Sequence, residues 1–273
     1  MFVVDLGPTD PDGGDGTAAT VLVLHGFPTS SHDWHRVIEE LARRHRVVLP
    51  DLLGYGLSDK PDRRYSLFEQ ADLVEAVARV LELRDVALTT HDMGDSVGGE
   101  LLARSIDGVL SFDVTRRVLS NGSIYIDMAQ LTDGQQLLLS LPDERLAEGP
   151  GRDALAAALR GTFAPGSDVP DEDVVVAAEL IVRDGGDRLL PRLIRYVEER
   201  REHEGRWTGA IERHPAPLTI VWGDADPIAV WPMAERVQEA RPEATVVRLR
   251  DVGHYPMLEA PAPFTAAIEH ALA

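Results

Sequence analysis

Two overlapping candidates for a nucleophile lie in the stretch TTHDMGDSVGG, from Thr89 to Gly99. The run GDSVG, centred on Ser96, fits the G-x-S-x-G pattern of a serine nucleophile elbow. Four residues earlier, the run THDMG has the same spacing of small residues with Asp92 at its centre. A serine would need a base to remove its proton, whereas an aspartate is already anionic and can attack an sp3 carbon directly.

The preceding strand separates the two candidates. The β-branched run DVALTT predicts a buried strand, and Asp92 lies at the turn between that strand and the next helix. An elbow needs this position, because there the side chain is clear of the sheet and faces the first helical N–H groups. Ser96 comes one helical turn later, so we expect it to pack the helix against the sheet, as Gly98 and Gly99 would.

Asp92 and Asp95 also have structural interpretations. Aspartate before a helix is a common N-cap, and the helix dipole stabilises its carboxylate. The same stabilisation keeps Asp92 ionised near neutral pH, which suits a nucleophile. Asp95 is expected to be a first-turn acid that complements the dipole.

A base and an orienting acid follow two later strands. Asp224 and Asp226 come after the run PLTIVWG, and His254 follows the run ATVVRLRD. Nucleophile Asp92, acid Asp226 and base His254 thus occur in a known chain order for strand-end triads. The run HGFP follows the first predicted strand, and there the backbone N–H groups of Phe27 and Met93 would form an oxyanion hole.

Strands that alternate with helices must position these residues. We expect strands at 20–26, 46–51, 85–91, 114–122, 217–224 and 244–251, with helical patterns at 32–45, 65–83, 94–106, 230–242 and 262–273. This alternation predicts an α/β fold with a mostly parallel, doubly wound sheet. An acidic turn is expected at 8–16.

The segment from about Ser123 to Pro215 breaks the alternation. It has helical patterns at 153–161, 171–184 and 188–207, separated by Gly/Pro clusters, and shows no clear strand pattern. We interpret it as a helical cap inserted after the strand that ends near Ser120, over the sheet edge where ligands bind. The predicted domains are a core of 1–122 and 216–273 and a cap of 123–215.

The amino-acid composition limits the classes of partner that the protein is expected to bind. The 273 residues are 44% hydrophobic, carry a formal net charge of −19 and include no cysteine, so a disulfide framework and a cysteine-based metal site are excluded. The acidic surface disfavours nucleic acid and anionic membranes. We see no signal peptide or membrane span, and expect a cytoplasmic protein without cofactor or metal. A homodimer is the oligomeric state that we consider for this protein.

Five runs carry a resemblance to a known family: HGFPTSSHDW, LPDLLGYGLSD, THDMGD, WGDADP and VGHYPMLEAP. Together they resemble the epoxide hydrolase and haloalkane dehalogenase branch of the α/β-hydrolase family. The runs HDMGDSV, LSNGSIY and GHYPMLEAP look most like the mesoderm-specific transcript proteins and their bacterial relatives. The resemblance implies an α/β-hydrolase fold and a two-step reaction, in which Asp92 forms an ester and His254, oriented by Asp226, activates water to hydrolyse it.

The resemblance also implies cap residues that contact substrate. Epoxide hydrolases protonate the ring oxygen with two cap tyrosines; Tyr196 lies where the second is expected, and Tyr125 is the only other tyrosine in the cap. Trp207 is a third expected contact. Haloalkane dehalogenases have Asn and Trp where this chain has Phe27 and Met93, whose side chains have no N–H for a halide. An epoxide is therefore favoured.

Three alternatives remain open. The chain could hydrolyse carbon–halogen bonds, act as an esterase through Ser96, or bind a ligand without catalysis. All agree on a small molecule as partner, and we expect a neutral, largely apolar one.

Overall fold

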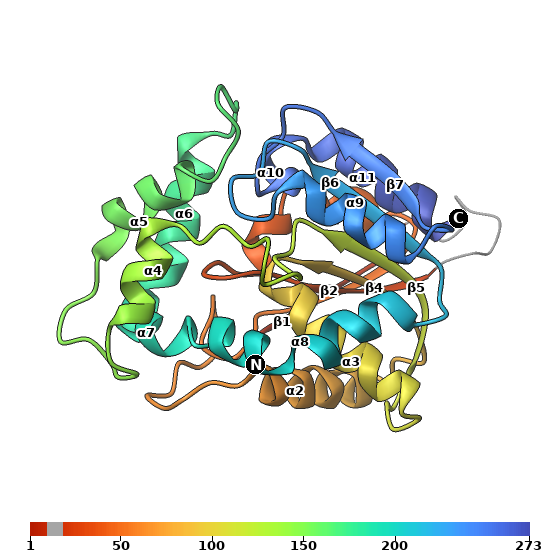
Figure 1. Cartoon of the computed structure of the whole chain (residues 1–273), viewed down its shortest axis with the longest axis horizontal. Helices are drawn as coiled ribbons and strands as arrows, with labels where there is room; N and C mark the ends of the chain where they lie inside the picture. Colours follow the sequence, from red (N-terminus) through yellow and green to blue (C-terminus); the bar gives the residue numbers. More distant parts are fainter. Residues whose placement is uncertain (10–18) are drawn as a thin grey trace.

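A central β-sheet organises residues 1–9 and 19–273, the part of the chain described by this computed structural model. Strand order is β1-β3-β2-β4-β5-β6-β7, with β1 antiparallel to β3 and the other pairs parallel (Figure 1). The predicted α/β-hydrolase fold is confirmed. The strands are β1 (Val3–Leu6), β2 (Thr20–Leu24), β3 (Arg46–Pro50), β4 (Asp85–His91), β5 (Asp113–Ser120), β6 (Leu218–Gly223) and β7 (Thr245–Leu249).

Helices cover both faces of the sheet. On one face α3 packs against β2, β4 and β5, with α2 beside it; on the other, α11 packs against β5, β6 and β7 (Figure 1). None of the helices in the described residues is both long and apolar enough to cross a membrane. The core helices are α1 (Ile38–Leu41), α2 (Leu67–Val80), α3 (Met93–Ile106), α9 (Trp231–Ala240), α10 (Pro256–Glu259) and α11 (Pro261–Leu272).

Five α-helices lie between β5 and β6, in a segment that is described throughout. They are α4 (Asp133–Ser140), α5 (Gly151–Arg160), α6 (Asp171–Val182), α7 (Leu190–Leu193) and α8 (Tyr196–Arg213). The first four lie to one side of the sheet, at the left of Figure 1, where α5 packs against α6 and α4 contacts α7. Helix α8 leaves this group and packs along α3, so the insertion covers one end of the core and also part of its flank.

The helix expected at 32–45 is broken in the structure. A 3-10 turn covers Ser31–Trp34, and α1 begins at Ile38 after Val37 leaves the helical region at φ −123°. Tertiary hydrogen bonds fix the first turn, because the N–H of Ser31 donates to the Asp51 carboxylate at 2.7 Å. Sequence periodicity carries no information about such a partner.

Three elements, β1, α4 and the four-residue α10, are absent from the sequence prediction, and one predicted helix is divided. Strand β1 is short and half-exposed, so it has little pattern. Helix α4 does have a signal, the capping box between Thr132 and Gln135. The pattern at 188–207 is divided between α7 and α8, and α8 continues to Arg213. The acidic turn expected at 8–16 falls largely outside the described residues.

Glycines let α3 lie close to its neighbours. A Cβ on Gly94 would lie 2.4 Å from the carbonyl oxygen of Leu24 in β2, and one on Gly98 would lie 2.7 Å from Cγ2 of Thr90 in β4. The expected packing of Gly98 against the sheet is therefore confirmed. Gly99 instead faces α8, where a Cβ would lie 2.9 Å from Cβ of Trp207.

Replacing Gly94 by alanine should lower the free energy of unfolding by about 1–3 kcal/mol, because the methyl group forces α3 away from β2. Gly134, in α4, is a matched control, since its nearest neighbour to an added Cβ is 3.8 Å away. Gly134→Ala should be neutral or stabilising by up to about 1 kcal/mol. Chemical denaturation of both variants measures the difference, and equal stabilities would contradict the packing argument.

Candidate active site

The turn after β4 is centred on Asp92. Its backbone has φ 51° and ψ −116°, a conformation that non-glycine residues rarely adopt, and α3 begins at Met93. The Asp92 carboxylate makes no capping hydrogen bond to α3, although its position is that of an N-cap. The side chain is buried, yet its oxygens are directed to the site rather than to the helix.

Ser96 is the fourth residue of α3 and faces the inserted segment. Its hydroxyl accepts a hydrogen bond from Nε of Arg200 at 2.7 Å, and the residue is buried. Throughout the described chain, no histidine donates to or accepts from this hydroxyl. A serine mechanism through Ser96 therefore lacks its base in this structure.

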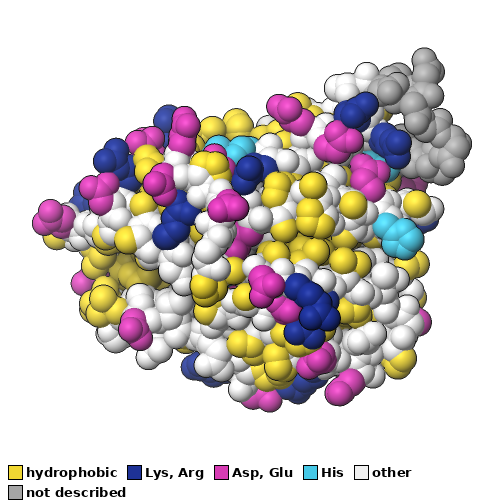
Figure 2. Space-filling view, turned by 90° about the horizontal axis from the view of Figure 1, so that it is seen from above, with side chains coloured by type: hydrophobic (Ala, Val, Ile, Leu, Met, Phe, Trp, Pro, Cys, Tyr) yellow, Lys and Arg dark blue, Asp and Glu magenta, His cyan; other side chains and the backbone are white. Residues whose placement is uncertain are grey.

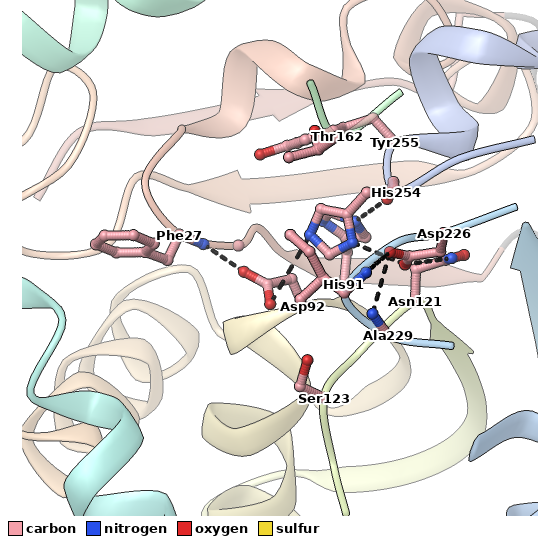
Figure 3. A network of polar contacts seen from close by, with 12 residues as sticks. Phe27, His91, Asp92, Asn121, Ser123, Thr162, Asp226, Ala229, His254 and Tyr255 are labelled. Atoms are coloured by element: carbon pink, nitrogen blue, oxygen red, sulfur yellow. Dashed lines mark hydrogen bonds and ion pairs between the residues drawn. The ribbon is translucent and has the colours of Figure 1, made fainter. Parts of the chain in front are cut away.

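The two oxygens of Asp92 have different surroundings (Figure 3). The backbone N–H of Phe27 donates to Oδ2 at 2.7 Å, whereas Oδ1 lies 3.9 Å from Nε2 of His254. Gly26 permits this approach, because a Cβ there would lie 2.6 Å from Cβ of Asp92. One oxygen is thus held by a backbone donor, and the other faces the histidine. Met93 N–H, the second expected donor, makes no hydrogen bond to Asp92.

Asp226 orients His254 (Figure 3). Nδ1 of His254 shares a hydrogen bond of 2.8 Å with Oδ2 of Asp226, and the side-chain amide of Asn121 donates to the same oxygen at 2.8 Å. The other oxygen, Oδ1, accepts from the N–H groups of Ile228 at 2.7 Å and Ala229 at 3.0 Å. Four donors therefore fix the Asp226 carboxylate, and the structure brings Asp92, Asp226 and His254 together.

Asn121 is a site residue that the sequence analysis missed. It follows β5 with φ 44°, a left-handed conformation that asparagine tolerates, and its amide oxygen accepts from the N–H of Gly223 at 3.0 Å. The run SNG after a predicted strand was the available signal. Asp224, two residues before Asp226, is not in the site, because its carboxylate pairs with Arg248 at 2.7 Å and accepts a hydrogen bond from the N–H of Asp251.

Electrostatics make His254 a strong base. Burial lowers the pKa of the imidazole, but the negative charges of Asp226 and Asp92 outweigh that effect and raise it to about 9. His91 lies beside it with ring centroids 5.1 Å apart, and its Nε2 is 2.8 Å from the carbonyl oxygen of His254. Burial lowers the pKa of His91 to about 4, so it is neutral and donates to that carbonyl.

Glu259 ties the histidine loop to the insertion. Its carboxylate accepts from the N–H groups of Gly253 at 3.0 Å and Tyr255 at 3.1 Å, on both sides of His254. It also accepts from the N–H of Ala164 at 2.8 Å, which belongs to the inserted segment. The position of His254 therefore depends on this contact between the core and the insertion.

Three buried tyrosines surround the nucleophile. The ring of Tyr196 lies 5.5 Å from that of Phe27, and burial, together with the charge of Asp92, raises the pKa of its hydroxyl. Tyr55 and Tyr255 were not expected here, yet burial and the charge of Asp92 raise their pKa values as well. The Tyr55 hydroxyl donates to the sulfur of Met93 at 3.2 Å, so it is already engaged.

Tyr255 follows His254 directly, and its ring packs edge-on against the imidazole at 5.0 Å. Figure 3 shows this ring beside His254, above Phe27 and Asp92. Its hydroxyl lies near the charges of Asp33 and Asp92 and shares a hydrogen bond with Thr29. It comes from the core rather than from the inserted segment. The signal for it was its position next to the predicted base.

Tyr125 does not reach the site, which corrects the expectation that it contacts substrate. Its hydroxyl donates to Glu212 at 2.8 Å, and the Arg236 guanidinium lies 3.9 Å from the centre of its ring. These partners commit both the polar and the aromatic part of the side chain elsewhere. Tyr125 and Tyr196 therefore do not converge on Asp92.

Trp207 is also misplaced by the sequence analysis. Its indole N–H donates to the buried Glu100 of α3 at 2.9 Å, and its ring packs against Phe68 of α2. The cause is the course of α8, which at this position has left the other inserted helices and lies along α3. Trp207 fastens the insertion to the core.

Two further buried acids lie near the triad. Burial raises the pKa of Asp33 to about 8, and the Thr29 hydroxyl is 2.5 Å from its carboxylate. Burial also raises the pKa of Asp95 well above its usual range, and neither of its oxygens has a hydrogen-bond partner within the described residues. Asp95 was expected to be a charged first-turn acid; its burial instead favours the neutral form.

A cavity of about 410 Å³ opens beside the triad. Phe27, His254 and Tyr255 line it on the core side, and residues of α4 and α5 line it on the other. Its size suits a small organic molecule.

Known protein sequences are similar to this chain along most of its length. The sequence pattern described as "Alpha/beta hydrolase family" matches residues 21–267. A Mycobacterium tuberculosis protein named as the hydrolase LipZ is 42% identical over 255 residues, which cover 93% of this chain and 88% of that protein. The mesoderm-specific transcript protein of Mus musculus is 35% identical over 263 residues, with 92% and 78% covered. A Mesorhizobium japonicum haloalkane dehalogenase is 44% identical over 110 residues, 40% of this chain and 33% of the enzyme.

Solved structures share the fold. An esterase from Thermogutta terrifontis matches with a TM-score of 0.76 at 21% identity, covering 98% of this chain and 91% of the esterase. An alpha/beta hydrolase fold protein from Burkholderia ambifaria matches with a TM-score of 0.75 at 25% identity, covering 97% and 92%.

Replacing Asp92 by asparagine should lower the pKa of His254 below about 9, because one of the carboxylate charges that raise it is removed. NMR titration of the imidazole measures the change. Asp95→Asn is the matched control, since it alters a buried acid one helical turn away whose neutral form is favoured by burial. An equal shift in both variants, or none in Asp92→Asn, would contradict the assigned electrostatics.

Proposed function

This chain belongs to the alpha/beta hydrolase family, and we propose that within it the chain hydrolyses neutral, largely apolar epoxides through an ester formed on Asp92. One observation carries the proposal. The elbow presents an aspartate, with one oxygen bonded to the Phe27 N–H and the other 3.9 Å from the histidine that Asp226 orients. This arrangement supports nucleophilic attack by a carboxylate followed by attack of water on the ester.

In the first step, Oδ1 of Asp92 attacks a ring carbon of the epoxide. The bond between that carbon and the ring oxygen breaks, and its electron pair stays on the oxygen, which takes a proton from a tyrosine hydroxyl. Tyr196 and Tyr255 are the two candidates, because both are buried next to Asp92. Their raised pKa values keep both hydroxyls protonated until the alkoxide forms.

In the second step, His254 takes a proton from a water molecule whose oxygen bonds to Cγ of Asp92. The negative charge that develops on Oδ2 is stabilised by the N–H of Phe27, which already donates to that oxygen. The bond between Cγ and Oδ1 then breaks, and the second proton of the water passes to Oδ1. The diol leaves with that oxygen, while the water oxygen stays on Asp92 and restores its carboxylate. The proton on His254 returns to the tyrosinate, and the net reaction adds one water to the epoxide.

The ester changes the electrostatics in the direction that the second step needs. Free Asp92 helps to raise the pKa of His254 to about 9, which favours the protonated imidazole. Ester formation neutralises Asp92, so the pKa of His254 falls at the stage when a neutral base is required.

A second candidate is the hydrolysis of carbon–halogen bonds. The similarity to a haloalkane dehalogenase over 110 residues favours it. Against it, the side chains of Phe27 and Met93 offer no N–H to a departing halide, and the indole of Trp207 is bonded to Glu100. Two hydroxyls beside Asp92 suit an oxygen leaving group better than a halide.

The remaining features of the proposal concern partner and location. A formal charge of −19 favours a neutral substrate over an anionic one and disfavours nucleic acid as a partner. A chain without cysteine fits a cytoplasmic location, which we include in the proposal.

A His254→Ala variant treated with terminal epoxides should accumulate an adduct of the substrate mass on Asp92, because the ester forms but water is not activated. Mass spectrometry of the intact chain and of its peptides detects the adduct. The double variant with Asp92→Asn should show none, and no mass should be added to Asp33 or Asp95. A haloalkane panel run in parallel tests the second candidate.

Absence of an Asp92 adduct with every epoxide and haloalkane would overturn the covalent mechanism. Ester hydrolysis that is lost in Ser96→Ala but kept in Asp92→Asn would favour the serine mechanism. Tight binding of a small molecule without turnover would favour a binding protein.

Tyr196→Phe and Tyr255→Phe should each lower kcat for epoxides by about tenfold or more, and the double variant by about 10²–10⁴-fold, because general acid catalysis is lost. Steady-state kinetics measure the effect. Tyr125→Phe is the matched control and should stay within about twofold, since its hydroxyl is bonded to Glu212. A loss in Tyr125→Phe equal to that in the other two would contradict the assignment.

A further inference from the structure

The cavity beside the triad continues between two helices of the insertion. Helix α5 packs against α6 and α4 contacts α7, so the space between α4 and α5 is left open. Side chains of both helices line the same cavity of about 410 Å³ that reaches His254 and Tyr255. The catalytic end and the outer end therefore belong to one continuous groove.

Exposure increases along this groove. His254 and Tyr255 are 2% exposed at its inner end, whereas Leu137 of α4 is 61% exposed and Ala154 and Ala158 of α5 are exposed as well. Figure 2 shows a hollow lined by hydrophobic side chains at the end of the molecule that carries α4 and α5. An apolar surface open to water is unfavourable unless something covers it.

The residues that line the groove determine which molecules can occupy it. Small alanines on α5 leave room, and Leu137, Leu155 and Leu159 supply hydrocarbon. No lysine or arginine belongs to this lining, and its one carboxylate, Asp133, lies on the exposed side. The one cationic group of the lining is His254 at the inner end, and its charge is already balanced by Asp226 and Asp92. A carboxylate or phosphate along the groove would find no further positive partner and would be repelled by Asp133.

A peptide segment is a poorer occupant than a hydrocarbon chain. Its backbone N–H and C=O groups would need partners in the groove. Two polar residues of the lining, Thr132 and Gln135, bond to each other in the capping box of α4, through contacts of 2.9 and 3.2 Å. The side-chain oxygens of Thr132 and Gln135 are therefore already engaged as acceptors, which leaves fewer acceptors along α4 for the N–H groups of a peptide.

We propose that the groove between α4 and α5 binds an unbranched alkyl arm of the substrate, which extends from the triad outward past Leu137. The substrate class is then a neutral molecule whose reacting carbon ends a long hydrocarbon chain. The identity of the reacting group as an epoxide rests on the function proposed above, but the binding of the alkyl arm does not require it.

Binding of an inert series tests the groove without chemistry. The probes are straight-chain primary alcohols from butanol to decanol, measured by calorimetry on the whole protein. Each added methylene should tighten binding by about fourfold until the groove is filled, the factor expected for burial of a CH₂ group. Octanoate should bind at least about tenfold more weakly than octanol, because the groove offers its charge no partner.

One variant and one control test whether the alkyl chain of the alcohol lies in the groove. Ala158→Phe narrows the groove, so the gain per methylene should stop at a shorter chain. Ala266→Phe places the same side chain on an exposed position of α11, outside the cavity, and should leave the series unchanged. Affinity that is independent of chain length, or an identical series in both variants, would overturn the proposal.

Turnover of terminal epoxides of the same chain lengths separates this proposal from the preceding one. A rise of kcat/KM with chain length that Ala158→Phe truncates would support both. Alcohols that follow the series while no epoxide reacts would support the groove and overturn the epoxide hydrolase function. Epoxide turnover without dependence on chain length would overturn the groove alone.

Discussion

The site depends on keeping one carboxylate buried, charged and only half engaged. Within the described residues, the Asp92 carboxylate accepts a single hydrogen bond, from the N–H of Phe27 to Oδ2, and its other oxygen is left to face His254. Glycines at 26 and 94 make this arrangement possible, because a side chain at either position would collide with Asp92 or with β2. A full set of hydrogen bonds would stabilise the carboxylate further and make it a weaker nucleophile.

Two other acids near Asp92, namely Asp33 and Asp95, are buried, and their burial limits the negative charge around the site. Burial raises the pKa of Asp33 to about 8 and that of Asp95 well above its usual range, which favours the neutral form of both acids. Asp226 and Asp92 make the largest favourable contributions to the charge of His254, with a smaller one from Glu259. Because Asp92 contributes to the pKa of His254, a change of charge on Asp92 changes the basicity of the imidazole. This coupling links the two steps of the proposed reaction.

The fold and the meeting of Asp92, Asp226 and His254 were predictable because each of these residues follows a strand. The ends of parallel strands meet at one edge of the sheet, so chain order and strand position locate Asp92, Asp226 and His254 without tertiary information. Asn121 obeys the same rule and was missed only because an amide does not suggest chemistry. Residues of the insertion follow no such rule. Tyr125 was misplaced because its position depends on partners on other elements, Glu212 and Arg236.

One part of the insertion, α8, is anchored to the core, whereas α4 and α5 border an open groove. Core residues in α3 determine where α8 is anchored. Helix α8 approaches α3 because Gly99 has no side chain, and Arg200 of α8 donates to Ser96 and to the carbonyl of Ser123 at 2.8 Å. The G-x-S-x-G pattern therefore serves here as the anchor of α8, one turn away from the nucleophile. Anchoring at this point holds Tyr196, four residues before Arg200, beside Asp92. Contacts of this kind are not needed between α4 and α5, so that part of the insertion can present a groove and determine which substrates reach an otherwise fixed site.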